Sequence, residues 1–156
     1  MKDFCDLDTT ELLAVGRRAL ELEARRLDQI AAAADATDQP LRELLHKMAL
    51  ESELRAAEVE REENVRPDDS RLASTPEQGF RLIQGYLTSL TKSFGEGPLP
   101  RDAALFFAES LEEETSRLCR VLAEHAREWP VNRLFVELSE RERKNVRYLR
   151  EVVLAG

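Results

Sequence analysis

The chain has 156 residues, of which 42% are hydrophobic and 35% are charged, and its formal net charge is −8. This length is typical of one domain with a substantial core, and the low glycine and proline counts, six each, favour long helices. The negative charge argues against a general nucleic-acid-binding protein, which needs a basic surface to neutralise phosphates. We therefore expect a single all-α domain over 1–156.

The chain carries no recognisable signal for export or membrane insertion. Residues 1–8 lack the charged and then apolar pattern of a secretory signal, and no apolar run is long enough to span a bilayer. Cys5 and Cys119 do not form a CxxC pair, which excludes structural zinc or a rubredoxin-type iron centre within this chain. We expect a cytoplasmic protein with no membrane partner, in which Cys119 faces the core.

The first hairpin is expected over 9–63. Asp8 and Glu11 have the spacing of a capping box, which predicts that the first long helix begins at position 9 and runs to about 34. A polar turn follows, and Pro40 is suited to the first turn of the second helix. Because the connection is short, the two helices should be antiparallel neighbours.

A long crossover, 64–101, follows the first hairpin. Its first part, 64–74, is polar and reads as a loop, and Thr75 and Gln78 then have the spacing that caps a shorter helix. The glycines and prolines within 95–100 end that helix. A link of this length lets the second and third long helices run parallel.

The second hairpin is expected over 102–154. Its first helix should span 102–127, and Pro130 opens its second helix. Pro130 follows Pro40 by 90 residues, so the turns of the two hairpins fall at similar positions. The pattern indicates an internal repeat.

Four glutamates recur between the hairpins. Glu112 follows Glu23 by 89 residues, and Glu142 follows Glu53 by the same number. Each lies on an apolar helix face at one level of the bundle, so we expect four inward-pointing carboxylates in one layer. A buried, unpaired carboxylate is costly and requires a metal, a cation or a proton. The sequence therefore predicts metal ligation by Glu23, Glu53, Glu112 and Glu142.

The segments around these glutamates resemble a known family. Residues 19–23 (ALELE), 49–58 (ALESELRAAE), 108–112 (AESLE) and 138–145 (LSERERKN) are similar to the four long helices of the rubrerythrin-like branch of the ferritin-like superfamily. The resemblance covers almost the whole chain. It implies a ferritin-like four-helix bundle of two related antiparallel hairpins, joined by a crossover that contains a short helix. It also implies a di-iron carboxylate site, iron oxidation or peroxide and oxygen chemistry, and a homodimer.

The chain departs from the family where the two metal-binding histidines belong. Three residues after the second and fourth glutamates stand Ala56 and Asn145. The amide oxygen of Asn145 is a weak ligand for a hard cation and Ala56 offers none, so the site loses its nitrogen donors. Iron is the first cofactor expected, with manganese or another divalent cation as alternatives. The rubredoxin-like module is also absent, so a redox cycle would need an external electron donor.

Two interpretations of the carboxylates remain open. One is a metal site that works without histidine. The other is a degenerate site without cofactor, neutralised by protons, water or Arg26, which lies one turn after Glu23, in a non-catalytic bundle that acts in protein association.

The two histidines are not expected to be ligands. His46 should lie in the core or an end layer, and His125 should interact with the C-terminus of its helix. No Ser/His/Asp or Cys/His arrangement is visible in the sequence, so nothing indicates nucleophilic catalysis.

Overall fold

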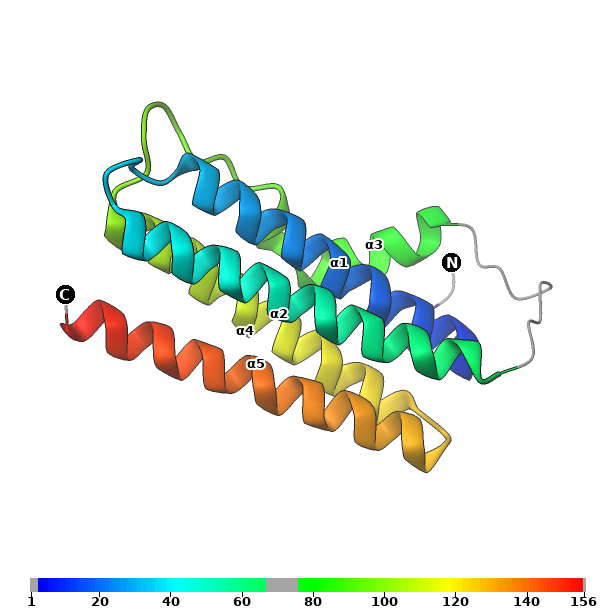
Figure 1. Cartoon of the computed structure of the whole chain (residues 1–156). Helices are drawn as coiled ribbons and strands as arrows, with labels where there is room; N and C mark the ends of the chain where they lie inside the picture. The colour runs from blue at the N-terminus through cyan, green and yellow to red at the C-terminus, as the bar shows by residue number, and fades with distance from the viewer. Residues whose placement is uncertain (1–2, 67–75, 156) are drawn as a thin grey trace.

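The computed structural model describes residues 3–66 and 76–155, and every regular element in these residues is helical (Figure 1). The all-α prediction is confirmed. The long helices are α1 (Thr9–Ala33), α2 (Gln39–Asn64), α4 (Arg101–His125) and α5 (Trp129–Ala155). The shorter elements are α3 (Pro76–Tyr86) and the 3-10 turns η1 (Phe4–Asp6) and η3 (Thr88–Leu90).

The helix boundaries follow their local sequence signals, except that α3 ends at Tyr86, before the glycines and prolines of 95–100 that were expected to end it. Asp8 accepts a hydrogen bond from the Glu11 amide at 2.8 Å and Glu11 accepts one from the Asp8 amide at 3.3 Å, so the capping box is formed. Pro40 lies in the first turn of α2, as predicted. The predicted cap at Thr75, the side chain of Gln78 and most of the predicted loop 64–74 lie outside the described residues.

The helices form two antiparallel hairpins, α1 with α2 and α4 with α5 (Figure 1). The crossover through α3 and η3 returns the chain to the end where α2 begins, so α2 and α4 run in the same direction, as the length of the link predicts. Helix α3 packs against α1 and α4. Within 3–66 and 76–155, no helix has the length and apolar character needed to cross a membrane.

The side chains of Glu114 and Arg26 bind the crossover segment to the long helices. Glu114 of α4 is buried and accepts hydrogen bonds from the Ser89 amide at 2.7 Å and the Ser89 hydroxyl at 2.6 Å. Arg26 of α1 donates to the Ser89 carbonyl at 3.2 Å and to the carbonyl of Lys92. Its guanidinium carbon also lies 4.1 Å from the centre of the Phe94 ring. Arg26 is thus engaged by the crossover.

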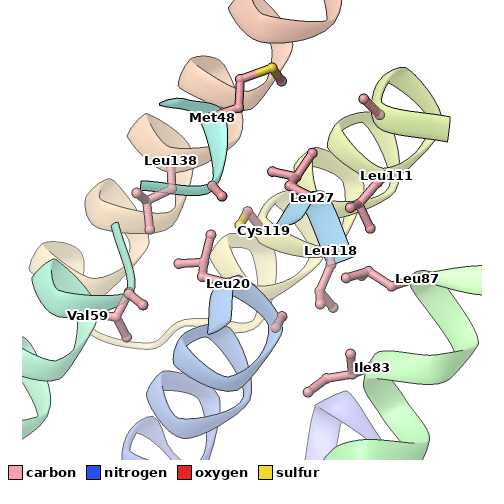
Figure 2. Packing of buried hydrophobic residues seen from close by; sticks show 14 of the residues in the cluster. Leu20, Leu27, Met48, Val59, Ile83, Leu87, Leu111, Leu118, Cys119 and Leu138 are labelled. Carbon is pink, nitrogen blue, oxygen red and sulfur yellow. The ribbon is translucent and has the colours of Figure 1, made fainter. Parts of the chain in front are cut away.

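The core runs between the long helices (Figure 2). Leu20 and Leu27 of α1 lie near Leu118 of α4, and Ile83 and Leu87 of the crossover add to the same cluster. Each fully buried leucine contributes roughly 1.5–3 kcal/mol, so this cluster supplies much of the driving force for folding. Cys119 is buried in it, which confirms its predicted place.

The two hairpins repeat, but not at the predicted offset of 89 residues. The buried positions of α1 recur in α4 after 92 residues, and those of α2 recur in α5 after 90. The matched positions include Leu13 and Leu105, Ala19 and Leu111, Glu23 and Thr115, Leu27 and Cys119, Leu41 and Val131, Leu45 and Phe135, Ser52 and Glu142, and Val59 and Leu149. The turn 34–38 is two residues longer than the turn 126–128, which accounts for the change of offset. The glutamates matched by sequence are therefore not structural equivalents.

Candidate carboxylate site

Three of the four predicted ligands meet inside the bundle. Glu23 of α1, Glu112 of α4 and Glu142 of α5 are fully buried, and one carboxylate oxygen of each lies within 4.8 Å of the others. Glu53, however, is exposed on α2. The expected inward orientation of Glu53 is wrong, and the buried layer holds the other three carboxylates.

The register of α2 explains the orientation of Glu53. The buried stripe of this helix recurs alternately every four and three residues and consists of Leu41, Leu45, Met48, Ser52, Arg55 and Val59. Glu53 follows Ser52 by one residue, which turns its side chain about 100° around the helix axis. Ser52 and Arg55 therefore face the core where Glu53 was expected.

Hydroxyl groups surround Glu23. Ser52 Oγ lies 2.5 Å from Glu23 Oε1 and 3.2 Å from the Met48 carbonyl oxygen, and Thr115 Oγ1 both donates to the Leu111 carbonyl at 2.9 Å and interacts with Glu23. Both hydroxyls stabilise the charged form of the Glu23 carboxylate by hydrogen bonding. Burial raises the pKa of Glu23 to about 7, although the hydroxyls and a nearby guanidinium lower it.

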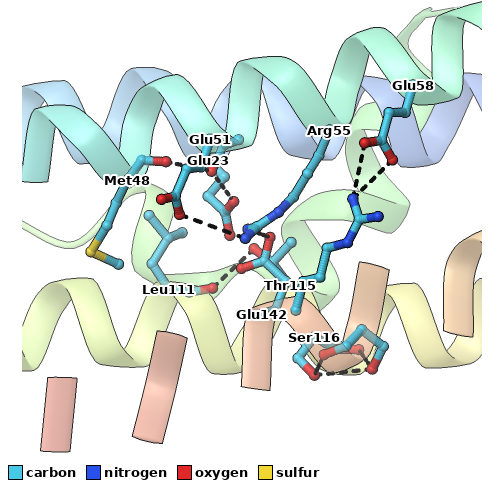
Figure 3. Close-up of polar contacts among 12 residues, drawn as sticks. Glu23, Met48, Glu51, Arg55, Glu58, Leu111, Thr115, Ser116 and Glu142 are labelled. Carbon is cyan, nitrogen blue, oxygen red and sulfur yellow. Dashed lines mark hydrogen bonds and ion pairs between the residues drawn. The ribbon is translucent and has the colours of Figure 1, made fainter. Parts of the chain in front are cut away.

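That guanidinium belongs to Arg55 of α2 (Figure 3). Its Nη1 donates to Glu142 Oε1 at 2.8 Å, and its side chain is only 8% exposed. Its Nη2 lies 3.7 Å from Glu51 Oε2, nearer the surface. Arg55 thus holds the place of counter-charge that the sequence suggested for Arg26.

Glu112 has no comparable partner. Neither of its carboxylate oxygens makes a hydrogen bond with a described residue, and the same holds for Oε2 of Glu23 and Oε2 of Glu142. Burial, and then the charge of Glu23, raise the pKa of Glu112 well above its usual range. Arg55 and the Asn145 amide lower it, although that amide does not meet the geometry of a hydrogen bond. Four buried carboxylate oxygens therefore lack a donor.

The positions where the resemblance implies histidine are occupied differently. Ala56 is buried and Asn145 is half-buried. His46 is exposed, with Nδ1 2.9 Å from Asp28 Oδ1, so its expected place in the core or an end layer is wrong. His125 bonds the last turn of α4, as expected. Among the described residues, the cluster that could hold a metal contains carboxylates alone.

A surface cleft of about 170 Å³ lies between α2 and α5. It is lined by Leu44, Lys47, Met48, Glu51, Asn145 and Tyr148. Two of these residues act on the buried cluster, since Glu51 approaches Arg55 and the Asn145 amide lowers the pKa of Glu112. The cleft therefore brings solvent close to the cluster.

No known protein family, curated protein or solved structure matches the chain. The resemblance to rubrerythrins thus rests on the sequence segments that carry it, and function must be argued from the geometry of the site.

Proposed function

We propose that this protein binds one divalent cation in the core of its bundle, with oxygen ligands from Glu23, Glu112 and Glu142. The observation that carries the proposal is the set of four buried carboxylate oxygens without a hydrogen-bond donor. Desolvating such groups is costly unless a positive charge compensates them. A cation among oxygens that already lie within 4.8 Å of one another would supply that charge.

The local charges favour one cation over two. Three ionised carboxylates and the Arg55 guanidinium leave two negative charges among the buried groups, which one divalent ion neutralises. Arg55 would replace the charge of a second metal by binding Glu142. The donors are carboxylates, with the Asn145 amide as a further candidate, and this set suits Mg²⁺, Mn²⁺, Ca²⁺ or Fe²⁺.

The parallel course of α2 and α4 supports a ferritin-like bundle, since a long crossover is typical of that topology. In this proposal the protein is a rubrerythrin-like metal-binding bundle with a mononuclear site. Bound iron would supply oxidation chemistry with oxygen or peroxide. The protein residues would hold the ion, keep most water out and, through Arg55, fix the orientation of Glu142.

Metal titration of a matched pair of variants tests the proposal. The protein, freed of metal by a chelator, is titrated by calorimetry with Mn²⁺, Mg²⁺, Ca²⁺ and, without oxygen, Fe²⁺, and bound metal is measured by elemental analysis. We expect about one ion per chain. Glu112→Gln should abolish uptake, whereas Glu53→Gln should bind like the wild type because Glu53 is exposed. Absence of uptake with Mn²⁺, Fe²⁺, Mg²⁺ and Ca²⁺ would contradict the proposal.

A second candidate is a metal-free bundle that acts in association with itself or a partner. The raised pKa values of Glu23 and Glu112 favour neutralisation by protons. Leu50 and Leu54 of α2 are 60% and 67% exposed, which supplies apolar surface for a homodimer or another complex. Leu54→Glu should then lower the mass seen by sedimentation without changing helix content. A monomeric wild type would rule out self-association.

A further inference from the structure

Cys5 and His125 meet although 119 residues separate them in the sequence. The Cys5 Sγ lies 3.5 Å from His125 Nε2, and Cys5 is exposed. Phe4 holds the segment in place, since its buried ring packs edge-on against Tyr86 at 5.5 Å and lies 6.0 Å from the His125 ring. This Cys/His pair is not visible in the sequence, and the fold brings it together.

The backbone fixes the protonation pattern of this histidine. His125 Nδ1 lies 2.9 Å from the Val121 carbonyl oxygen, which can only accept a hydrogen bond. Nδ1 therefore carries the proton, and in the neutral imidazole Nε2 is the acceptor that faces Cys5. A thiol beside a base that a third group orients is the arrangement of an activated nucleophile.

Some charged groups near the pair favour a thiolate at Cys5, and others oppose it. His125 is the last residue of α4, so its ring lies at the negative end of the helix dipole. Asp3 and Asp6 share the segment with Cys5 and oppose a thiolate, but the Asp3 carboxylate already accepts a hydrogen bond from the Phe4 amide, and the Asp6 carboxylate accepts one from the Asp3 amide. An imidazolium next to the sulfur therefore compensates the thiolate directly.

We propose that Cys5 is a nucleophilic thiol, activated by His125, that forms a mixed disulfide with small disulfides such as oxidised glutathione. His125 Nε2 takes the thiol proton, and the thiolate attacks one sulfur of the disulfide. A new bond joins Cys5 to that sulfur, the original sulfur–sulfur bond breaks, and the released thiolate takes the proton from His125. Cys5 is oxidised and the leaving half is reduced to a thiol.

The rest of the chain offers no thiol to reverse this step. Cys119 is buried in the core, where burial raises the pKa of its thiol and keeps the sulfur from solvent. The mixed disulfide on Cys5 therefore lasts until an external thiol removes it. This inference does not depend on the carboxylate site.

The rate of reaction with 4,4′-dithiodipyridine tests the proposal. At pH 6.5, wild-type Cys5 should react about tenfold faster than Cys5 in His125→Gln, because His125 Nε2 takes the thiol proton as the sulfur attacks. The rate advantage of the wild type should shrink as the pH rises, because hydroxide then removes the thiol proton without help from His125. Equal rates and profiles would overturn the proposal.

Two controls exclude a merely structural effect of His125. Circular dichroism must show the same helix content in both proteins, and a loss of packing alone would change the rate without changing the shape of the pH profile. Intact-mass spectrometry after treatment with oxidised glutathione should show one added glutathionyl group on the wild type and none on Cys5→Ser. Addition to Cys5→Ser, or none to the wild type, would contradict the assignment.

Discussion

Arg55 and Glu142 form a buried ion pair between α2 and α5, with 2.8 Å between Nη1 and Oε1. These helices touch much less than the partners within each hairpin. A second, more exposed pair joins the same helices where Arg141 binds both carboxylate oxygens of Glu58, at 2.9 and 3.0 Å. Breaking the pair inside the bundle should cost more stability than breaking the exposed pair, because both of its groups are desolvated.

Removing one member of the buried pair should therefore be costly. We expect Arg55→Met to lower the free energy of unfolding of the metal-free protein by about 3–5 kcal/mol, because Glu142 is left without its partner. The double variant Arg55→Met, Glu142→Met removes both charges and should recover most of the loss. Urea denaturation at pH 8 with a chelator measures both. A double variant no more stable than Arg55→Met would show that the pair is not the source of the effect.

The pKa of Glu23 predicts how stability changes with pH. It is raised from 4.5 to about 7 in the folded protein, so the folded state holds a proton that the unfolded chain releases. The stabilisation of the folded state by this proton is complete below about pH 4.5 and is lost as the pH rises through 7. In chelator, the free energy of unfolding should fall by up to about 3 kcal/mol between pH 5 and 8.

Urea denaturation at several pH values, with Glu23→Gln as the comparison, checks this expectation. The variant should show a shallower decline, and the remaining slope should reflect Glu112, whose pKa is raised in the same direction. An identical slope in the two proteins would mean that Glu23 is ionised in the fold at all these pH values.

The sequence predicted the helices well because their signals are local. The capping box at Asp8 and the proline at position 40 act within one turn, and the spacing of 90 residues from Pro40 to Pro130 is the true offset of α2 and α5. The site residues were harder to predict from the sequence. Matching Glu53 to Glu142 is an error of one residue, and one residue along a helix turns a side chain by about 100° around the axis.

The roles of Arg55 and of the Cys5–His125 pair are not apparent from the local sequence pattern. The buried stripe of α2 is regular, but Ser52 and Arg55 interrupt its apolar character, so Arg55 was missed although its spacing was a usable signal. Cys5 and His125 meet only because the N-terminal segment packs across the end of α4. Such a long-range contact leaves no periodic signal.

The close packing of Gly16 against Phe135 gives a further prediction. A Cβ atom at Gly16 would lie 2.4 Å from Cε1 and 2.6 Å from Cζ of the buried Phe135 ring. Gly16→Ala should therefore destabilise the protein by about 1–3 kcal/mol, although alanine favours helix more than glycine does. Thermal unfolding measures the change.

The same substitution at an open glycine is the control. A Cβ at Gly85 of α3 meets nothing within 4 Å, so Gly85→Ala should leave stability unchanged or raise it by up to about 1 kcal/mol. Adding Phe135→Leu to Gly16→Ala should recover part of the loss by making room. If Gly16→Ala proves as stable as Gly85→Ala, the helices are less tightly packed there than the structure indicates.

The cleft between α2 and α5 predicts how a cation would reach the proposed site. Glu51 lines the cleft, its side chain is 35% exposed, and Oε2 lies 3.7 Å from the Arg55 guanidinium. A carboxylate at this opening attracts cations from solvent, and such steering raises association rates by roughly 10-fold or more. Glu51→Gln should therefore slow Mn²⁺ uptake several-fold while lowering equilibrium affinity much less.

Stopped-flow uptake, followed with a competing fluorescent chelator, separates the rate from the affinity. Glu53→Gln is the matched control, because it removes the same charge two residues along α2, from a side chain about 200° around the helix. Added salt should shrink the effect of Glu51→Gln, since screening weakens steering. If Glu51→Gln loads as fast as the control while Glu112→Gln fails to bind, the cation uses another route. If no variant and no wild-type protein takes up metal, the cation site itself is refuted, and the three buried carboxylates are held by protons and Arg55.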